Sequence, residues 1–242
     1  MDTAYSSAPA HLSRQATLFA WLSATSVACL VIANVIGVKL FSYDLGDFKV
    51  EHTAGMLTFP VTFLITDLIN EYYGKKAARR VAIISFAMGM LVFFVIKIAQ
   101  AMPYLDAPFN VSQQAFDQIL GSSTGMYLAS MTAFLLGSLA DITLFGWIKR
   151  LTGSKYVWLR ATGSTVVSQM LDSFVVTYLA FSVFRHIGGG AGAEPMPIDA
   201  VLKTAATGYI LKFVISLALT PAIYAGRWLI RTYMGMQPLP PE

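Results

Sequence analysis

Long, uninterrupted blocks of apolar residues recur along the chain, with short polar stretches between them. Each block holds roughly 20 or more residues, the length that a helix rising about 1.5 Å per residue needs to cross about 30 Å of hydrocarbon. A transmembrane barrel would instead show segments of about ten residues with alternating apolar and polar positions, and no stretch keeps that alternation for long. The pattern predicts an all-α polytopic membrane protein with six transmembrane helices, over residues 17–41, 54–73, 80–101, 124–148, 161–184 and 203–228.

Polar segments at both ends frame one membrane domain. Residues 1–15 are small and polar, which predicts a flexible cytoplasmic tail. Residues 16–231 hold the six predicted helices, and residues 232–242 form a second short cytoplasmic tail. The first apolar block is too long for the core of a signal peptide, and no small-residue cleavage pattern closes it. We therefore expect this block to remain as a helix.

Composition and charge agree with a membrane protein and predict its orientation. Apolar residues make up 56% of the chain and charged residues only 12%, which lies outside the range of soluble domains. The net charge of +4 comes from Lys and Arg that collect in alternate loops, at residues 75–80 and 149–160. Such loops face the cytoplasm, so both termini are predicted to be cytoplasmic. The basic residues do not interleave with aromatics on a soluble face, which argues against a nucleic-acid partner.

Cysteine and histidine offer no metal site, and no cofactor is expected. The lone Cys29 lies inside the first predicted span, and His11, His52 and His186 fall in the tail or in outside loops. Intramembrane hydrolysis would need a deep nucleophile with a base in reach, and no histidine accompanies the serines and threonines of the spans. We therefore predict no catalytic residue and no enzyme.

A short list of ionisable and amide side chains lies within the predicted spans. Each costs a few kcal/mol or more at the bilayer centre unless it is paired or hydrated, so these residues are the candidate site. Asp67 and Glu71 share one helical face, and Gln169 and Asp172 lie one turn apart. The residues that could line one polar cavity are Asn34, Asp67, Asn70, Glu71, Asp141, Gln169, Asp172 and Lys212.

Two readings of the carboxylates in the second predicted span stay open. Asp67 and Glu71 lie near its cytoplasmic end, where they could simply pair with Arg79, Arg80 or Arg150. Burial disfavours a charged carboxylate, so either of them is alternatively a candidate proton carrier.

In the same span, Pro60 follows Phe59, and a proline there is expected to free a carbonyl and bend the helix.

Several short motifs resemble one family of transporters. They are Asn34, the segment 58–62, the segment 67–71, Tyr73-Gly74 with 78–80, Gly137, Asp141, Arg160, 163–165, Gln169, 172–173 and Lys212. Together they resemble the queuosine precursor transporter family, which belongs to the vitamin uptake transporter group. The resemblance covers nearly the whole membrane domain. One departure is Ser138, where many relatives are expected to carry glutamine.

The resemblance implies uptake of 7-cyano-7-deazaguanine or 7-aminomethyl-7-deazaguanine across a bacterial inner membrane. It implies a fold similar to the six-helix substrate-binding subunits of vitamin importers. The chain has no GxxxxGK[ST] motif, so any ATP coupling would come from a partner. The expected partners are the 7-deazapurine, the lipid bilayer and a second copy of the chain in a homodimer. The alternatives are uptake of another vitamin-like or nucleobase-like solute, and a membrane-embedded receptor that does not transport.

The same resemblance, read with the chemistry of the base, implies a set of binding residues. A guanine-like edge offers two donors that a carboxylate accepts side by side, its carbonyl needs a donor, and its ring needs an aromatic wall. Asp172 or Glu71 is expected at the donor edge, and Phe59 is expected to stack on the ring. The full expected substrate-binding set is Asn34, Phe59, Asp67, Glu71, Gln169, Asp172 and Lys212, and the residues expected to be structural or to gate are Pro60, Asn70, Asp141, Arg160 and Ser164.

Overall fold

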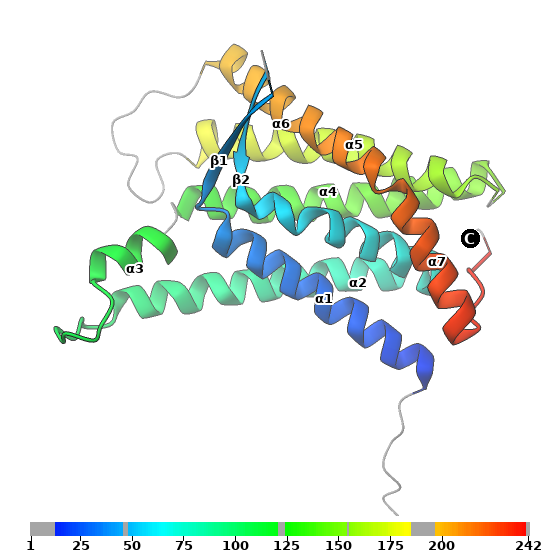
Figure 1. Cartoon of the computed structure of the whole chain (residues 1–242), viewed down its shortest axis with the longest axis horizontal. Helices are drawn as coiled ribbons and strands as arrows, with labels where there is room; N and C mark the ends of the chain where they lie inside the picture. The colour runs from blue at the N-terminus through cyan, green and yellow to red at the C-terminus, as the bar shows by residue number, and fades with distance from the viewer. Residues whose placement is uncertain (1–12, 46–47, 121–123, 154, 185–196, 241–242) are drawn as a thin grey trace, which may run out of the picture.

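The protein is an all-α polytopic membrane fold with a small β-hairpin at one end (Figure 1). The structure is a computed structural model that describes residues 13–45, 48–120, 124–153, 155–184 and 197–240. Its elements are α1 (Arg14–Ile36), β1 (Leu40–Leu45), β2 (Phe48–Thr53), the 3₁₀ turn η1 (Ala54–Leu57), α2 (Phe59–Ala101), α3 (Gln113–Leu120), α4 (Thr124–Leu151), α5 (Val157–Tyr178), the π-helical turn η2 (Leu179–Val183), α6 (Ile198–Ala218) and α7 (Thr220–Met234). Among the described residues, five helices are long and apolar enough to cross a membrane, which confirms the predicted class. Most of the predicted N-terminal tail, residues 1–12, lies outside the described residues.

The longest helix, α2, consists of two helical segments joined at Gly74. Its 43 residues would extend about 65 Å as one straight helix, roughly twice the hydrocarbon thickness. Gly74 interrupts it with φ 83° and ψ 170°, a conformation that only glycine adopts readily. Figure 1 shows the two segments running antiparallel. The spans predicted at 54–73 and 80–101 are both present, but the second segment follows Gly74 at once, without the predicted loop.

Two prolines begin helices, and each corrects a sequence prediction. Pro60 lies in the first turn of α2, where its missing N–H has no helical acceptor to lose, so the predicted bend at Pro60 is wrong. Pro221 lies in the first turn of α7. Because proline cannot continue α6, the predicted span 203–228 is instead divided between α6 and α7.

The β-hairpin and the turn that follows it close one end of the bundle. β1 and β2 pair antiparallel, from Leu40 opposite Thr53 to Leu45 opposite Phe48. The Ala54 N–H then donates to the Lys39 carbonyl over 2.7 Å. A Cβ on Gly55 would lie 2.5 Å from the Ala33 carbonyl oxygen, so only glycine lets η1 approach α1 this closely. The sequence patterns predicted a helix to residue 41 and no hairpin.

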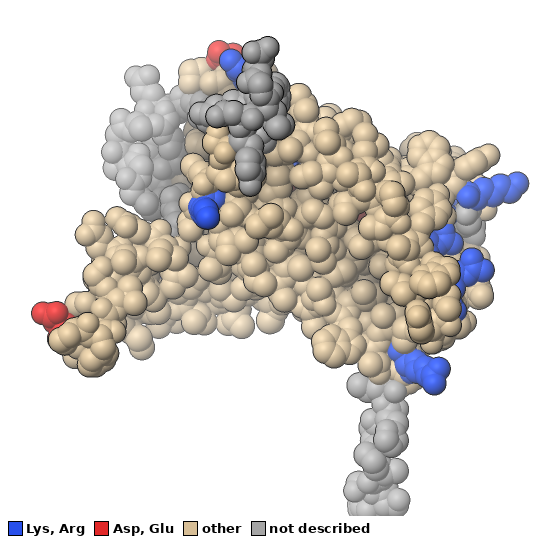
Figure 2. Space-filling view, in the orientation of Figure 1, with Lys and Arg blue, Asp and Glu red and all other residues tan. Residues whose placement is uncertain are grey.

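The surface and the core are those of a multi-pass membrane protein. One buried cluster joins α2, α4, α5 and α7 through Leu68, Phe145, Ala161 and Ile223. Large apolar side chains such as Trp21 and Ile98 are exposed, as expected of residues that face lipid. On the face drawn in Figure 2, Lys and Arg gather near α7 and the start of α1, and the middle of the molecule carries few charges. The middle of this face is therefore poor in charge, as the lipid-facing part of a membrane protein must be.

Candidate functional site

A cavity of about 170 Å³ lies beneath the hairpin, between α1, η1, α2, α4, α5 and α6. This volume is far above the roughly 10 to 15 Å³ that admits one water molecule. Its lining mixes aromatic rings with polar groups, as binding sites for small polar solutes do. The aromatic and polar residues of the lining are Asn34, His52, Thr53, Thr58, Phe59, Thr62, Phe63, Ser130, Phe134, Ser138, Asp172 and Lys212.

An ion pair and an aromatic ring stand together in the cavity wall. The Lys212 ammonium of α6 bonds to Oδ2 of Asp172 on α5. The same ammonium lies 5.5 Å from the centroid of the Phe59 ring, within the range of a cation–π contact. The side chains of Lys212 and Asp172 keep 12% and 20% exposure, so a solute in the cavity can reach both. The wall therefore offers an acceptor, a donor and a flat apolar surface.

The amide of Asn34 is held in place on the α1 side of the cavity. Its Nδ2 donates to the Leu30 carbonyl over 2.9 Å, and its Oδ1 accepts from the Ser130 hydroxyl of α4 over 3.2 Å. These bonds fix the orientation of the amide. Asn34 can thus present a fixed polar group to a ligand.

His52 lines the cavity from β2 and was not among the candidates from the sequence. Its Nδ1 accepts the Thr53 N–H over 2.8 Å. Burial lowers the pKa of His52, and the charge of Lys212 acts in the same direction. A neutral imidazole that accepts at Nδ1 carries its proton on Nε2, so His52 offers an N–H donor. A search for polar residues within the predicted spans could not identify His52, because His52 lies outside them and reaches the cavity only when the hairpin folds over the bundle.

Several candidate residues are buried outside the cavity lining. Asp67, Asp141 and Gln169 are exposed by 4%, 0% and 0%. Asp141 Oδ1 accepts from Ser168 over 3.1 Å and from Thr165 over 3.4 Å. Asn70 joins α2 to α4 by donating to the Ile142 carbonyl over 3.1 Å, and Ser164 donates within α5 to the Ala161 carbonyl over 3.3 Å.

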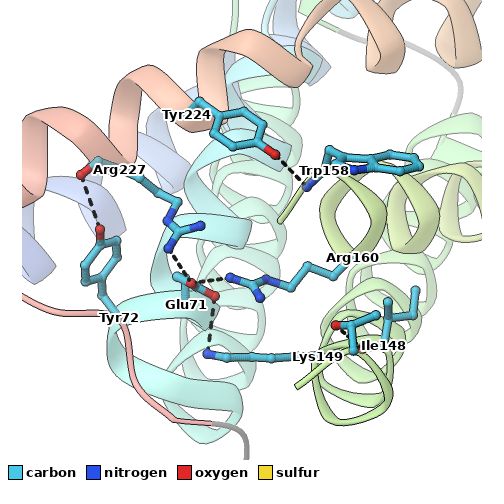
Figure 3. A network of polar contacts seen from close by, with 9 residues as sticks. Glu71, Tyr72, Ile148, Lys149, Trp158, Arg160, Tyr224 and Arg227 are labelled. Atoms are coloured by element: carbon cyan, nitrogen blue, oxygen red, sulfur yellow. Dashed lines mark hydrogen bonds and ion pairs between the residues drawn. The ribbon is translucent and has the colours of Figure 1, made fainter. Parts of the chain in front are cut away.

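Glu71 lies in a buried charge cluster with cations from three other helices (Figure 3). Its carboxylate is 3.2 Å from Lys149 Nζ on α4 and 3.5 Å from Arg227 Nη2 on α7, and it bonds to Arg160 on α5. Arg160 also lies over the Phe145 ring, 5.5 Å from the centroid. Glu71 therefore pairs with cations, as one reading of the sequence expected, but with partners other than those expected. None of these residues lines the cavity.

Two groups of candidates thus meet at two separate places, and the other buried candidates line neither of them. Asn34, Phe59, Asp172 and Lys212 meet in the cavity. Glu71 and Arg160 meet in the charge cluster, which we call the Glu71 cluster and define as Glu71 with Lys149, Arg160 and Arg227.

Comparison with known proteins confirms the resemblance found in the motifs. Residues 53–226 match the family described as "Putative vitamin uptake transporter". A "Probable queuosine precursor transporter" of Bacillus subtilis is 29% identical over 214 residues, covering 88% of this chain and 84% of the relative. A protein of the same name from Haemophilus influenzae is 26% identical over 215 residues, covering 84% of this chain and 83% of the relative.

A third relative carries the same functional name. The "Queuosine precursor transporter" of Escherichia coli is 29% identical over 161 residues, covering 66% of this chain and 67% of the relative. No solved structure matches the chain significantly. The names of the family and of all three relatives describe transport, which agrees with the prediction of a transporter rather than an enzyme.

Proposed function

The chain belongs to the vitamin uptake transporter family, and we propose that it imports a 7-deazaguanine precursor of queuosine across a bacterial inner membrane. The names of the three relatives support the substrate class. The observation that carries the proposal is the convergence of Asn34, Phe59, Asp172 and Lys212 on one cavity. They come from α1, α2, α5 and α6, so their meeting depends on the fold and not on closeness in sequence.

The chemistry of this cavity fits a guanine-like base. The Asp172 carboxylate can accept the ring N–H and the exocyclic amine, while the Lys212 ammonium or the Asn34 amide can donate to the carbonyl oxygen. The Phe59 ring offers a stacking surface for the flat base. In this arrangement the base lies beside the Asp172–Lys212 ion pair and forms hydrogen bonds with both charged groups.

We assign the Glu71 cluster to closure of the opposite end of the pathway. The cluster draws four helices together through a buried carboxylate (Figure 3), whereas the cavity is lined in part by residues of β2 and η1, which lie at the hairpin end of the bundle (Figure 1). If the basic end is cytoplasmic, the cavity faces outward, as it must in order to load solute for import. Arg160 and Glu71 would then have to separate before solute leaves.

The test is uptake of radiolabelled 7-cyano-7-deazaguanine by cells that cannot synthesise queuosine and depend on this protein. We expect label to enter and queuosine to appear in tRNA. If the tRNA stays unmodified while the protein is properly inserted, the substrate assignment is wrong. Proteoliposomes of purified protein separate a transporter from a receptor, because a receptor binds label without flux. The homodimer that the resemblance leads us to expect is tested by the mass of the purified protein in detergent, corrected for bound detergent.

A further inference from the structure

Three buried polar residues form a layer one helical turn deeper than the cavity. Each lies three or four residues from a cavity residue of its own helix, so each projects from the same helical face. In each pair the deeper residue is the one nearer to the Glu71 cluster along the helix. The pairs of cavity residue and deeper residue are Phe63 and Asp67 on α2, Ser138 and Asp141 on α4, and Asp172 and Gln169 on α5.

The polar atoms of this layer are only partly satisfied. Among the described residues, Asp67 Oδ1, Asp141 Oδ2 and both amide atoms of Gln169 are buried and have no hydrogen-bond partner. The other oxygen of Asp141 is held by Ser168 and Thr165. Leaving such groups without partners in a dry interior costs free energy, so each of them has the capacity and the driving force to accept or donate a further hydrogen bond.

Gln169 occupies a position on α5 between the cavity and the contacts of Asp141. It lies four residues after Thr165, which bonds to Asp141, and three residues before Asp172, which lines the cavity. All three share one face of the helix. Gln169 therefore lies, along this face of α5, between a residue that lines the cavity and a residue that bonds to Asp141.

The cations near this layer are already engaged elsewhere. Asp67 and Asp141 lie three residues and one residue from the hydrogen bond between Asn70 and Ile142 that joins α2 to α4. The charged groups that act on Asp67 are Asp141 from α4, Glu71 from its own helix and Arg160 from α5. Arg160 bonds to Glu71, which also takes Lys149 and Arg227. In the described part of the chain, no ion pair reaches Asp67 or Asp141. Two buried carboxyl groups that interact, with no bonded cation, favour a state in which they share one proton.

We propose that Asp67 and Asp141 form a proton-binding site coupled to substrate import, a proposal that rests on the proposed function. One carboxyl carries the proton and donates it to the carboxylate of the other, and the Gln169 amide completes the hydrogen bonding. A proton needs only this pair of oxygens, whereas a metal cation needs several oxygen ligands around it. A proton that enters through the cavity neutralises one charge in the layer, and its loss to the cytoplasm restores that charge.

The test uses purified protein in proteoliposomes with radiolabelled 7-cyano-7-deazaguanine. With the outside about one pH unit more acidic, one proton per substrate supports about tenfold accumulation, which a protonophore should abolish. Asp67→Asn and Asp141→Asn should each lose accumulation but keep the exchange of internal for external substrate, since exchange needs no net proton movement. Asp199→Asn, at an exposed carboxylate in the first turn of α6, is the matched control and should accumulate like the wild type.

The outcomes separate this proposal from the proposed function. If the wild type transports the base but ignores the pH gradient, or follows a sodium gradient instead, the proton site is wrong and the substrate assignment stands. If the wild type transports no base, the substrate assignment fails. The proton site is then judged from the infrared carbonyl band of a protonated carboxylic acid, which should be present in the wild type and absent from Asp141→Asn. Absence of that band from the wild type overturns the proposal.

Discussion

Lys212 and Asp172 join α6 to α5 by an ion pair inside the wall of the cavity. The pair has two consequences that can be separated. It holds two helices together, and it places a carboxylate and an ammonium where a solute can contact them. Because both side chains line the cavity and keep 12% and 20% exposure, a polar solute or water can replace either partner, so we expect the pair to contribute more to binding than to folding.

The first prediction concerns Asp172→Asn. This change replaces one acceptor oxygen with a donor and removes the charge-assisted contact to the base. Hydrogen bonds to charged groups are worth about 1.5 to 3 kcal/mol, so substrate affinity should fall roughly tenfold to a hundredfold. Substrate binding and the melting temperature in detergent measure this, and the melting temperature should stay near that of the wild type.

Reversing the pair is the control for this prediction. Asp172→Lys combined with Lys212→Asp keeps an ion pair between α5 and α6 but exchanges the positions of donor and acceptor. We expect near-normal melting with weak binding. A depressed melting temperature in Asp172→Asn, with normal binding in the surviving protein, would show that the pair serves the fold alone.

The second prediction concerns Glu71→Gln. The carboxylate is exposed by only 2%, and its loss leaves three cations without their shared partner. Breaking a buried ion pair on one side costs about 3 to 5 kcal/mol, so the melting temperature and the amount of inserted protein should both fall. Lys76→Gln, at an exposed cation close by in sequence, should change neither. Normal melting of Glu71→Gln with lost uptake would instead indicate that Glu71 acts in transport.

The sequence predicts the membrane-spanning class and part of the site for one physical reason. Apolar blocks of membrane length have few alternatives to a spanning helix. Polar groups within them cost free energy unless they are paired or hydrated, so they mark candidate functional residues. Asn34, Asp172 and Lys212 could be selected on these grounds and Phe59 from the motif resemblance, and the structure brings all four to one cavity.

Other features depend on packing that a linear pattern does not contain. The partners of Glu71 come from three helices, so no spacing in the sequence identifies Lys149, Arg160 and Arg227 as a set. His52 reaches the cavity because two strands fold back over the bundle. Pro221 marks the division of α6 from α7 in the sequence, but a hydropathy pattern does not detect it because the apolar residues continue on both sides.

The third prediction concerns pH and His52. Burial holds the pKa of His52 below its usual value of about 6.5. The neutral ring therefore adds stability that is present above about pH 6.5 and is lost as the pH falls through the lower pKa of the folded state. Protonation would also turn Nδ1 into a donor facing the Thr53 N–H. The melting temperature should fall more between pH 7.5 and pH 5.5 for the wild type than for His52→Asn, and equal falls would contradict this.

The fourth prediction concerns orientation. Single cysteines at Lys76 and Lys155 should react with a membrane-impermeant maleimide only from the cytoplasmic side, and one at Asp106 only from outside. All three positions are exposed, and Cys29, which is buried, can be replaced by alanine to remove any background. Labelling of Lys76→Cys and Asp106→Cys from the same side would contradict the alternating topology.

The fifth prediction concerns the break in α2. Gly74 has φ 83° and ψ 170°, a region that side-chain-bearing residues enter at a cost of about 1 to 3 kcal/mol. Gly74→Ala should therefore lower the melting temperature, because the reversal between the two segments of α2 cannot relax without moving one of them.

Gly146→Ala is the matched control: it lies within α4, and an added Cβ would meet nothing closer than the Lys75 side chain at 4.0 Å. Alanine is favoured over glycine inside a helix by roughly 0.5 to 1 kcal/mol, so Gly146→Ala should melt at or slightly above the wild-type temperature. Equal melting of the two variants would mean that the chain can reverse at this point without a left-handed residue.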